Sequence, residues 1–134
     1  MTFIDTNVFV YFVDGRNREK QSIARAVLTD AIGSRQYVIS AQVLNEFANV
    51  SLKKLGMTED EVRQYIEAFQ HIQVVFQQLG CTVRALELRK QYGLQFYDAL
   101  LLAAAESAGC DKILTEDLND GQVYCGITAE NPFK

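Results

Sequence analysis

Hydrophobic positions along the chain alternate between short runs and helical spacing. Thr2–Ile4 is a short, apolar, β-compatible segment, and the apolar positions of Thr6–Phe12 suit a helix packed on a sheet. From Arg18 to Ile32, apolar residues recur three and four positions apart, which predicts an amphipathic helix that ends at Gly33. The chain is therefore expected to begin with a strand followed by two helices.

The same two patterns continue to the C-terminus. Ser40 is an expected N-cap, and Thr58 with Glu61 forms a capping box. Further helices are expected at Ala41–Leu55, Thr58–Gln70, Thr82–Tyr92 and Tyr97–Ala108. Further strands are expected at Tyr37–Ile39, His71–Phe76, Lys112–Thr115 and Val123–Tyr124, with an extended tail over Ile127–Phe133. Strands separated by helices predict an α/β fold of three layers, α/β/α, with a mainly parallel central sheet.

Length and composition indicate one compact domain spanning residues 1–134. The chain has 49% hydrophobic and 22% charged residues and one proline, which is typical of a folded protein with its own core. Its net charge is −4 and its pI about 5.0, so no general basic field attracts nucleic acid. If nucleic acid is the substrate, binding must be local and metal-assisted.

The cysteines and the N-terminus bear on the cellular compartment. The three cysteines have no C-x-x-C spacing, and the single histidine, His71, cannot complete a zinc site with them in a standard pattern. They are expected to be small buried residues in a reducing compartment. The N-terminus has no basic region before its apolar stretch, and no apolar run approaches the length of a membrane span. These features predict a cytoplasmic protein.

Four acidic residues, Asp5, Glu46, Asp98 and Asp117, lie at the ends or margins of apolar segments. Asp5 and Asp117 follow predicted strands, and side chains at the carboxyl ends of parallel strands meet at one edge of a sheet. Asp98 lies in the first turn of an apolar helix, and Glu46 lies at the margin of an apolar stripe. Carboxylates that converge without Cys or His predict a site for Mg²⁺ or Mn²⁺. Metal-assisted phosphodiester chemistry is the first hypothesis.

Each acid also has a simpler interpretation. Asp5 and Asp98 could be helix N-caps, and Asp117 and Asp120 could be turn residues beside Gly121. Glu46 is not at a capping position. Carboxylates a few Å apart repel each other by about 1 to 4 kcal/mol per pair. A cluster of all four is therefore costly without a cation.

Four segments around these acids occur in the order found in a known family. They are Phe3–Val8, Val43–Phe47, Phe96–Leu101 and Ile113–Gly121. In this order they resemble the motifs of the PIN-domain ribonucleases, most closely the small VapC toxins of toxin–antitoxin pairs. The ending Ile127–Phe133 is similar to tails in one PIN subgroup.

The resemblance implies a PIN-like α/β/α fold and cleavage of single-stranded or looped RNA, with 5′-phosphate and 3′-hydroxyl products. It implies that one or two Mg²⁺ or Mn²⁺ ions are cofactors bound by the catalytic residues Asp5, Glu46, Asp98 and Asp117. Asn7 and Thr115 would hold these carboxylates in place. Asp120 and Glu116 flank Asp117 and could share its place.

Partners follow from the same resemblance and from two groups of residues. Arg16, Arg18 and Lys20, and also Lys53 and Lys54, could contact the RNA backbone, although each could equally be part of a solvated helix face. A surplus of aromatic residues suggests a homodimer face or a groove for an antitoxin protein, with a purely structural core as the alternative. These residues are Phe9, Tyr11, Phe12, Tyr65 and Phe69.

Three other functions would place different demands on these residues. A haloacid-dehalogenase phosphatase needs a second Asp where Asn7 stands. A receiver domain needs an adjacent acidic pair before its phospho-acceptor strand and a late Lys, and this pattern is absent. A catalytically inactive PIN fold that binds RNA or protein remains the main alternative to a nuclease.

Overall fold

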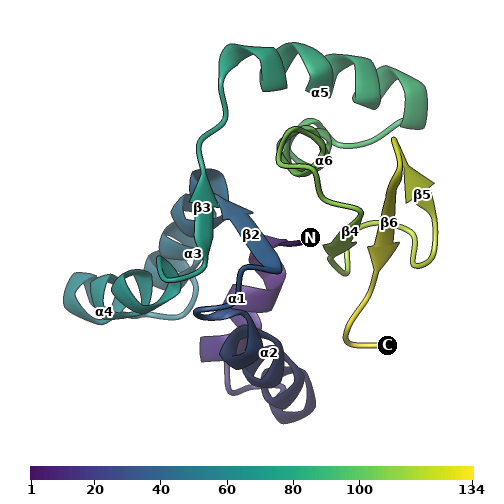
Figure 1. Cartoon of the computed structure of the whole chain (residues 1–134). Helices are drawn as coiled ribbons and strands as arrows, with labels where there is room; N and C mark the ends of the chain where they lie inside the picture. The colour runs from purple at the N-terminus through teal and green to yellow at the C-terminus, as the bar shows by residue number, and fades with distance from the viewer.

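A six-stranded sheet with helices on both faces organises the structure (Figure 1). The computed structural model describes residues 1–134. The strands are β1 (Thr2–Ile4), β2 (Tyr37–Ser40), β3 (Gln73–Val75), β4 (Lys112–Leu114), β5 (Val123–Tyr124) and β6 (Ile127–Glu130). The helices are α1 (Thr6–Val13), α2 (Arg18–Ala31), α3 (Ala41–Lys53), α4 (Glu59–Phe69), α5 (Leu79–Tyr92) and α6 (Phe96–Ser107).

The sheet has the strand order β3-β2-β1-β4-β6-β5. β1 lies between β2 and β4 and is parallel to both, and only β5 is antiparallel, to β6. Helices α1 to α4 lie on one side of the sheet, and α6, with α5 packed along it, lies on the other (Figure 1). The predicted α/β/α fold with a mainly parallel sheet is confirmed.

Most of the aromatic surplus belongs to the core. The Phe9 and Phe69 rings are buried with their centroids 4.9 Å apart, and the half-buried Phe12 and Tyr65 pack against Phe69. Because these rings contact one another between α1, α3 and α4, they support the core interpretation. The most exposed large apolar side chains lie elsewhere, at Phe76, Leu79, Val83, Leu86, Tyr97 and Val123.

Two predicted starts were wrong by two residues or more, and several other ends differ by one or two residues. α5 begins at Leu79, three residues before the predicted start. β3 begins at Gln73 and not at His71, because the N–H groups of His71 and Ile72 donate to carbonyls at the end of α4. The capping box is confirmed, since Glu61 N donates to Thr58 Oγ1 and Thr58 N to Glu61 Oε1.

Two further findings concern the thiols and the helices. All three cysteines are free, and Cys110 is buried, which raises the pKa of its thiol to about 11. No helix combines the length and the apolar character needed to cross a bilayer.

Candidate metal centre

Three carboxylates from distant parts of the chain converge at one edge of the sheet. Asp5 follows β1, Asp98 lies in the first turn of α6, and Asp117 lies in the loop after β4. One oxygen from each lies within 4.8 Å of the others. The arrangement follows from the sheet, because β1 and β4 are adjacent and parallel and both end here.

Asp5 is the most buried and most firmly held member. Thr6 N donates to its Oδ1 at 2.6 Å, and Thr115 Oγ1 donates to its Oδ2 at 2.7 Å. Burial raises the pKa of Asp5 to about 7; the two hydrogen bonds oppose the rise, and the charges of Asp117 and Asp98 add to it. Asp5 is also the N-cap of α1, as its simpler interpretation predicts.

Asp98 and Asp117 form the more open side of the cluster. Asp98 is half-buried, and burial, followed by the charges of Asp117 and Glu46, raises its pKa to about 6. The capping interpretation was wrong for Asp98, since Gln95 is the N-cap of α6. Burial also raises the pKa of Asp117, while a 3.2 Å hydrogen bond from Asn7 Nδ2 lowers it.

Glu46 lies at the rim and not within the converging set. Its carboxylate accepts a hydrogen bond from Gln42 Nε2, one turn earlier on α3. It lines a cavity of about 350 Å³ together with Asn7, Arg16 and Asp117. Its charge acts on Asp98, which places it beside the cluster. The structure therefore brings three of the four predicted acids together and leaves the fourth nearby.

The predicted supporting residues behave differently from one another. Thr115 Oγ1 donates to Asp5 and accepts from Asp117 N at 3.0 Å, and Asn7 Nδ2 donates to Asp117. Asp120 does not join them. It accepts from Asn131 N at 2.8 Å and pairs with Lys134 at 3.4 Å, because the C-terminal tail returns beside this loop.

Glu116 also points to other partners. It pairs with Lys20 Nζ at 2.9 Å and accepts from Tyr11 Oη at 2.8 Å. The Lys20 ammonium in turn lies 4.7 Å from the centroid of the Tyr11 ring. Neither Glu116 nor Asp120 shares the place of Asp117, and Lys20 is engaged in this network.

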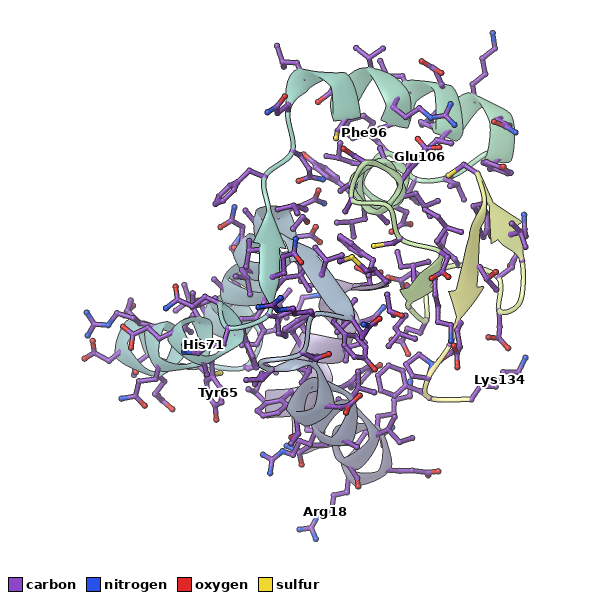
Figure 2. All side chains as sticks on the ribbon, viewed as in Figure 1. Arg18, Tyr65, His71, Phe96, Glu106 and Lys134 are labelled. Atoms are coloured by element: carbon purple, nitrogen blue, oxygen red, sulfur yellow. The ribbon has the colours of Figure 1, made fainter.

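The other predicted basic residues differ in their partners and in their exposure. Arg16 forms a two-pronged contact with Asp14, at 2.9 and 2.8 Å. Arg18, at the start of α2, is exposed, and its side chain projects away from the molecule (Figure 2). Lys54 is exposed and lines the same cavity as Arg16 and Glu46. Arg16 and Lys54 are therefore the basic residues nearest the acids in this cavity.

The donor atoms fit a hard divalent cation. No Lys or Arg forms an ion pair with Asp5, Asp98 or Asp117. Beside it, Thr6 Oγ1 and Asn7 Oδ1 are buried oxygens without a hydrogen-bond partner. An all-oxygen set of this kind suits Mg²⁺ or Mn²⁺ and not zinc. The sequence placed Thr6 in the segment Phe3–Val8 that resembles the first family motif but gave it no role of its own.

Comparison with solved structures supports the fold. The FitAB complex bound to a DNA fragment has a TM-score of 0.73 at 16% identity, covering 100% of this chain and 96% of that one. A toxin–antitoxin complex from Klebsiella pneumoniae has a TM-score of 0.68 at 20% identity, covering 98% of both chains. VapC20 from Mycobacterium tuberculosis, described as a sarcin-ricin loop cleaving toxin, has a TM-score of 0.68 at 14% identity, covering 84% of this chain and 87% of that one.

Comparison with sequences gives the family. No curated protein matches the chain. The family model described as PIN domain matches residues 2–122, which include all four acids and their supporting residues. The predicted resemblance is confirmed, and this chain belongs to the PIN domain family.

Proposed function

We propose that this chain is a metal-dependent endoribonuclease and the toxin of a toxin–antitoxin pair. The observation that carries the proposal is the convergence of three carboxylates that form no ion pair within the chain and lie beside two unpaired buried oxygens. Membership of the PIN family agrees with it. The toxin–antitoxin descriptions of the structural relatives support the second half of the proposal.

Asp5, Asp98 and Asp117 would hold the ion, with Glu46 at the rim. A bound Mg²⁺ or Mn²⁺ would supply Lewis-acid activation of water and neutralise charge on the phosphodiester. The protein's part is to fix the ligands: Thr6 N and Thr115 Oγ1 hold the two oxygens of Asp5, and Asn7 holds Asp117. These contacts keep the carboxylate oxygens in place before any ion arrives.

RNA would reach the acids through the cavity of about 350 Å³. Arg16 and Lys54 line this cavity and would contact phosphates, whereas Glu46 and Asp117 line its acidic side. Because the chain has a net charge of −4, it has little general affinity for nucleic acid. Cleavage should therefore be selective for a structured RNA that fits the cavity.

Cleavage of total cellular RNA, with the 5′ ends mapped, tests the proposal. The wild type with Mn²⁺ should produce defined cuts that EDTA abolishes. Asp5→Asn and Asp98→Asn should reduce cleavage by more than about 100-fold, because each removes a ligand charge. Asp120→Asn is the matched control, since its carboxylate binds the C-terminal tail and should leave cleavage unchanged.

Expression in cells gives an independent result. The wild type should arrest growth, and Asp5→Asn should not, although it remains folded. If the folded wild type cuts no RNA with either ion, or if Asp5→Asn is as toxic as the parent, the nuclease proposal fails and an RNA- or protein-binding module takes its place.

Metal binding is tested separately by thermal unfolding. Mn²⁺ should raise the melting temperature of the wild type, because an ion that binds only the folded state stabilises it. The rise should be much smaller for Asp98→Asn and undiminished for Asp120→Asn. Equal rises in all three proteins would exclude Asp98 as a ligand.

A further inference from the structure

Two glutamines link the rim of the candidate metal centre to a helix on the opposite face of the sheet. Gln42 Nε2 donates to Glu46 Oε1, and Gln42 Oε1 accepts from Gln77 Nε2 at 2.8 Å. Gln77 Nε2 also donates to the carbonyl oxygen of Leu100 at 3.3 Å. Gln42 and Glu46 lie on α3, Leu100 lies on α6, and Gln77 lies in the connection between β3 and α5. We call Gln42 and Gln77 the glutamine pair.

The two ends of this chain of hydrogen bonds fix the orientation of both amide groups. The ionised carboxylate of Glu46 and the carbonyl of Leu100 can only accept, so each must face an amide NH₂ group. Gln42 therefore turns its NH₂ group toward Glu46 and its oxygen toward Gln77. Gln77 uses its NH₂ group for both Gln42 and Leu100. Neither amide can turn over without breaking both of its hydrogen bonds.

The contact between Gln42 and Glu46 would by itself be an ordinary helix pair. Residues four apart on a helix commonly interact, and such pairs contribute about 0.2–0.5 kcal/mol. Gln77 changes this, because it lies 35 residues from Gln42 in the chain and attaches the pair to α6. α3 and α6 cover opposite faces of the sheet (Figure 1), and α6 carries Asp98 two residues before Leu100. Gln77 thus connects the helix of Glu46 to the helix of Asp98.

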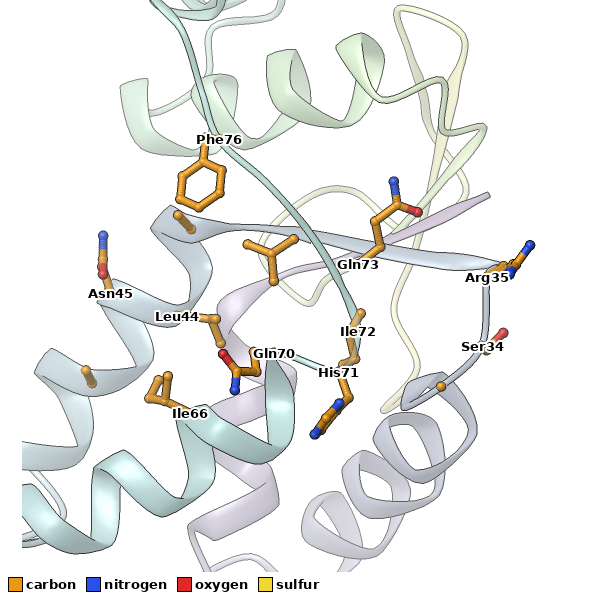
Figure 3. Close-up of a pocket in the computed structure, with 14 residues that line it drawn as sticks. Ser34, Arg35, Leu44, Asn45, Ile66, Gln70, His71, Ile72, Gln73 and Phe76 are labelled. Atoms are coloured by element: carbon orange, nitrogen blue, oxygen red, sulfur yellow. The ribbon is translucent and has the colours of Figure 1, made fainter.

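The glutamine pair is separate from the largest groove beside it. This groove of about 700 Å³ lies between α3, the end of α4 and β3 (Figure 3). Asn45, Phe76 and the exposed Gln73 line it, whereas neither glutamine of the pair does. The contacts of the pair are therefore with Glu46 and α6 and not with the groove.

We propose that the glutamine pair positions Glu46 for metal binding, an inference that rests on the proposed nuclease function. Holding a Glu side chain in one rotamer costs about 1.5–2 kcal/mol of conformational entropy. Glu46 forms no ion pair within the chain, so the bond from Gln42 holds its carboxylate. Residues that orient a metal ligand typically change metal affinity by about 10–100-fold. Gln42 and Gln77 are thus positioning residues that act through Glu46.

Calorimetric titration of the full chain with Mn²⁺ tests the proposal. Gln42→Met keeps a side chain of similar length but removes the donor, and it should weaken Mn²⁺ binding by about 10-fold or more. Gln77→Met should weaken binding by a smaller factor, because Gln42 then keeps its bond to Glu46 but loses the contact that fixes its orientation. Gln73→Met is the matched control: Gln73 lines the groove, and its variant should bind Mn²⁺ as the wild type does.

Removal of Glu46 separates positioning from a general structural effect. In the Glu46→Ala background, Gln42→Met should change Mn²⁺ affinity by less than about 2-fold, because no carboxylate remains to be positioned. A general disturbance of the fold would instead weaken binding by the same factor with and without Glu46. Equal factors in the two backgrounds therefore overturn the proposal, and urea unfolding shows that each variant is folded.

The remaining outcomes distinguish this proposal from the nuclease function. If Asp98→Asn weakens Mn²⁺ binding and Gln42→Met does not, the glutamine pair has no positioning role, and the proposed metal centre stands. A loss of affinity in Gln73→Met as large as that in Gln42→Met overturns the positioning role as well. If the wild type binds no Mn²⁺, both proposals fail, since Glu46 then has no ion to hold.

Discussion

One hydroxyl group, that of Thr115, connects the carboxylate of Asp5 to the backbone of Asp117 in the candidate metal centre. Its Oγ1 donates to Asp5 at 2.7 Å and accepts from Asp117 N at 3.0 Å. Asn7 Nδ2 lies 3.5 Å from the same oxygen. Because Thr115 is only 1% exposed, water cannot replace these contacts if the hydroxyl is lost.

Thr115→Val, which keeps the shape and removes the hydroxyl, should lower the free energy of unfolding by about 1–3 kcal/mol. It should also weaken Mn²⁺ binding by about 10–100-fold, because Asp5 loses the donor that orients it. Thr115→Ser, which keeps the hydroxyl, should retain most of the stability and most of the Mn²⁺ affinity of the wild type. Urea unfolding and calorimetric titration measure the two effects. An unchanged Mn²⁺ affinity in Thr115→Val would contradict a positioning role for Thr115.

How far the site could be predicted depends on the residue. Asp5 and Asp117 follow from strand ends in a parallel sheet, and Asp98 from the first turn of a buried helix. The helical wheel placed Glu46 on the correct side of α3, but it cannot give the reach of a side chain, which here contacts Gln42. Asp120 could not be excluded from sequence, because its partners lie in a tail whose path depends on the whole fold.

At the scale of elements, α5 shows why boundaries are harder to predict than the elements themselves. Its end at Gly93 was predicted, and Gly93 has the left-handed φ of +69° that such a helix end favours. Its start was missed because Leu79 is 83% exposed and lies outside the pattern of buried positions. An exposed residue leaves no signal in a pattern of core residues.

The two glycines of α5 should respond in opposite directions to alanine. Gly93→Ala should destabilise the protein by about 1–2 kcal/mol, because a Cβ is strained at positive φ. Gly80→Ala should be stabilising by about 0.5–1 kcal/mol, since alanine favours the helix and no heavy atom lies within 4 Å of the added Cβ. Urea unfolding compares them. Equal effects would contradict the assigned start or end of α5.

At the scale of the whole molecule, the candidate metal centre is a source of instability, because burial opposes the ionisation of two of its carboxylates. Burial raises the pKa of Asp5 to about 7 and that of Asp98 to about 6. The folded chain therefore holds protons that the unfolded chain releases between about pH 4 and 7. For these two groups, the stabilising contribution is present at low pH and is lost as pH rises toward 7.

In EDTA, the stability of Asp5→Asn relative to the wild type should therefore increase as pH rises from 5 to 7. The difference should be on the order of 2 kcal/mol. Comparing the two proteins cancels the contribution of carboxylates with lowered pKa, such as Asp14. Thermal unfolding between pH 5 and 7 measures the stability difference. With saturating Mn²⁺ at pH 7, the wild type should become the more stable of the two proteins. Parallel curves for the two proteins would contradict a raised pKa for Asp5.

The candidate metal centre joins residues that are far apart in the chain and can therefore assemble only late in synthesis. The contacts from Asp5 to Thr115 and from Asn7 to Asp117 each span 110 residues. β1 is made first, but it lies between β2 and β4 in the sheet. Asp5, which follows β1, meets Thr115 only after β4 has been made. A chain cut short before residue 117 lacks one of the three carboxylates, so the cluster can form only after residues 1–117 have been made.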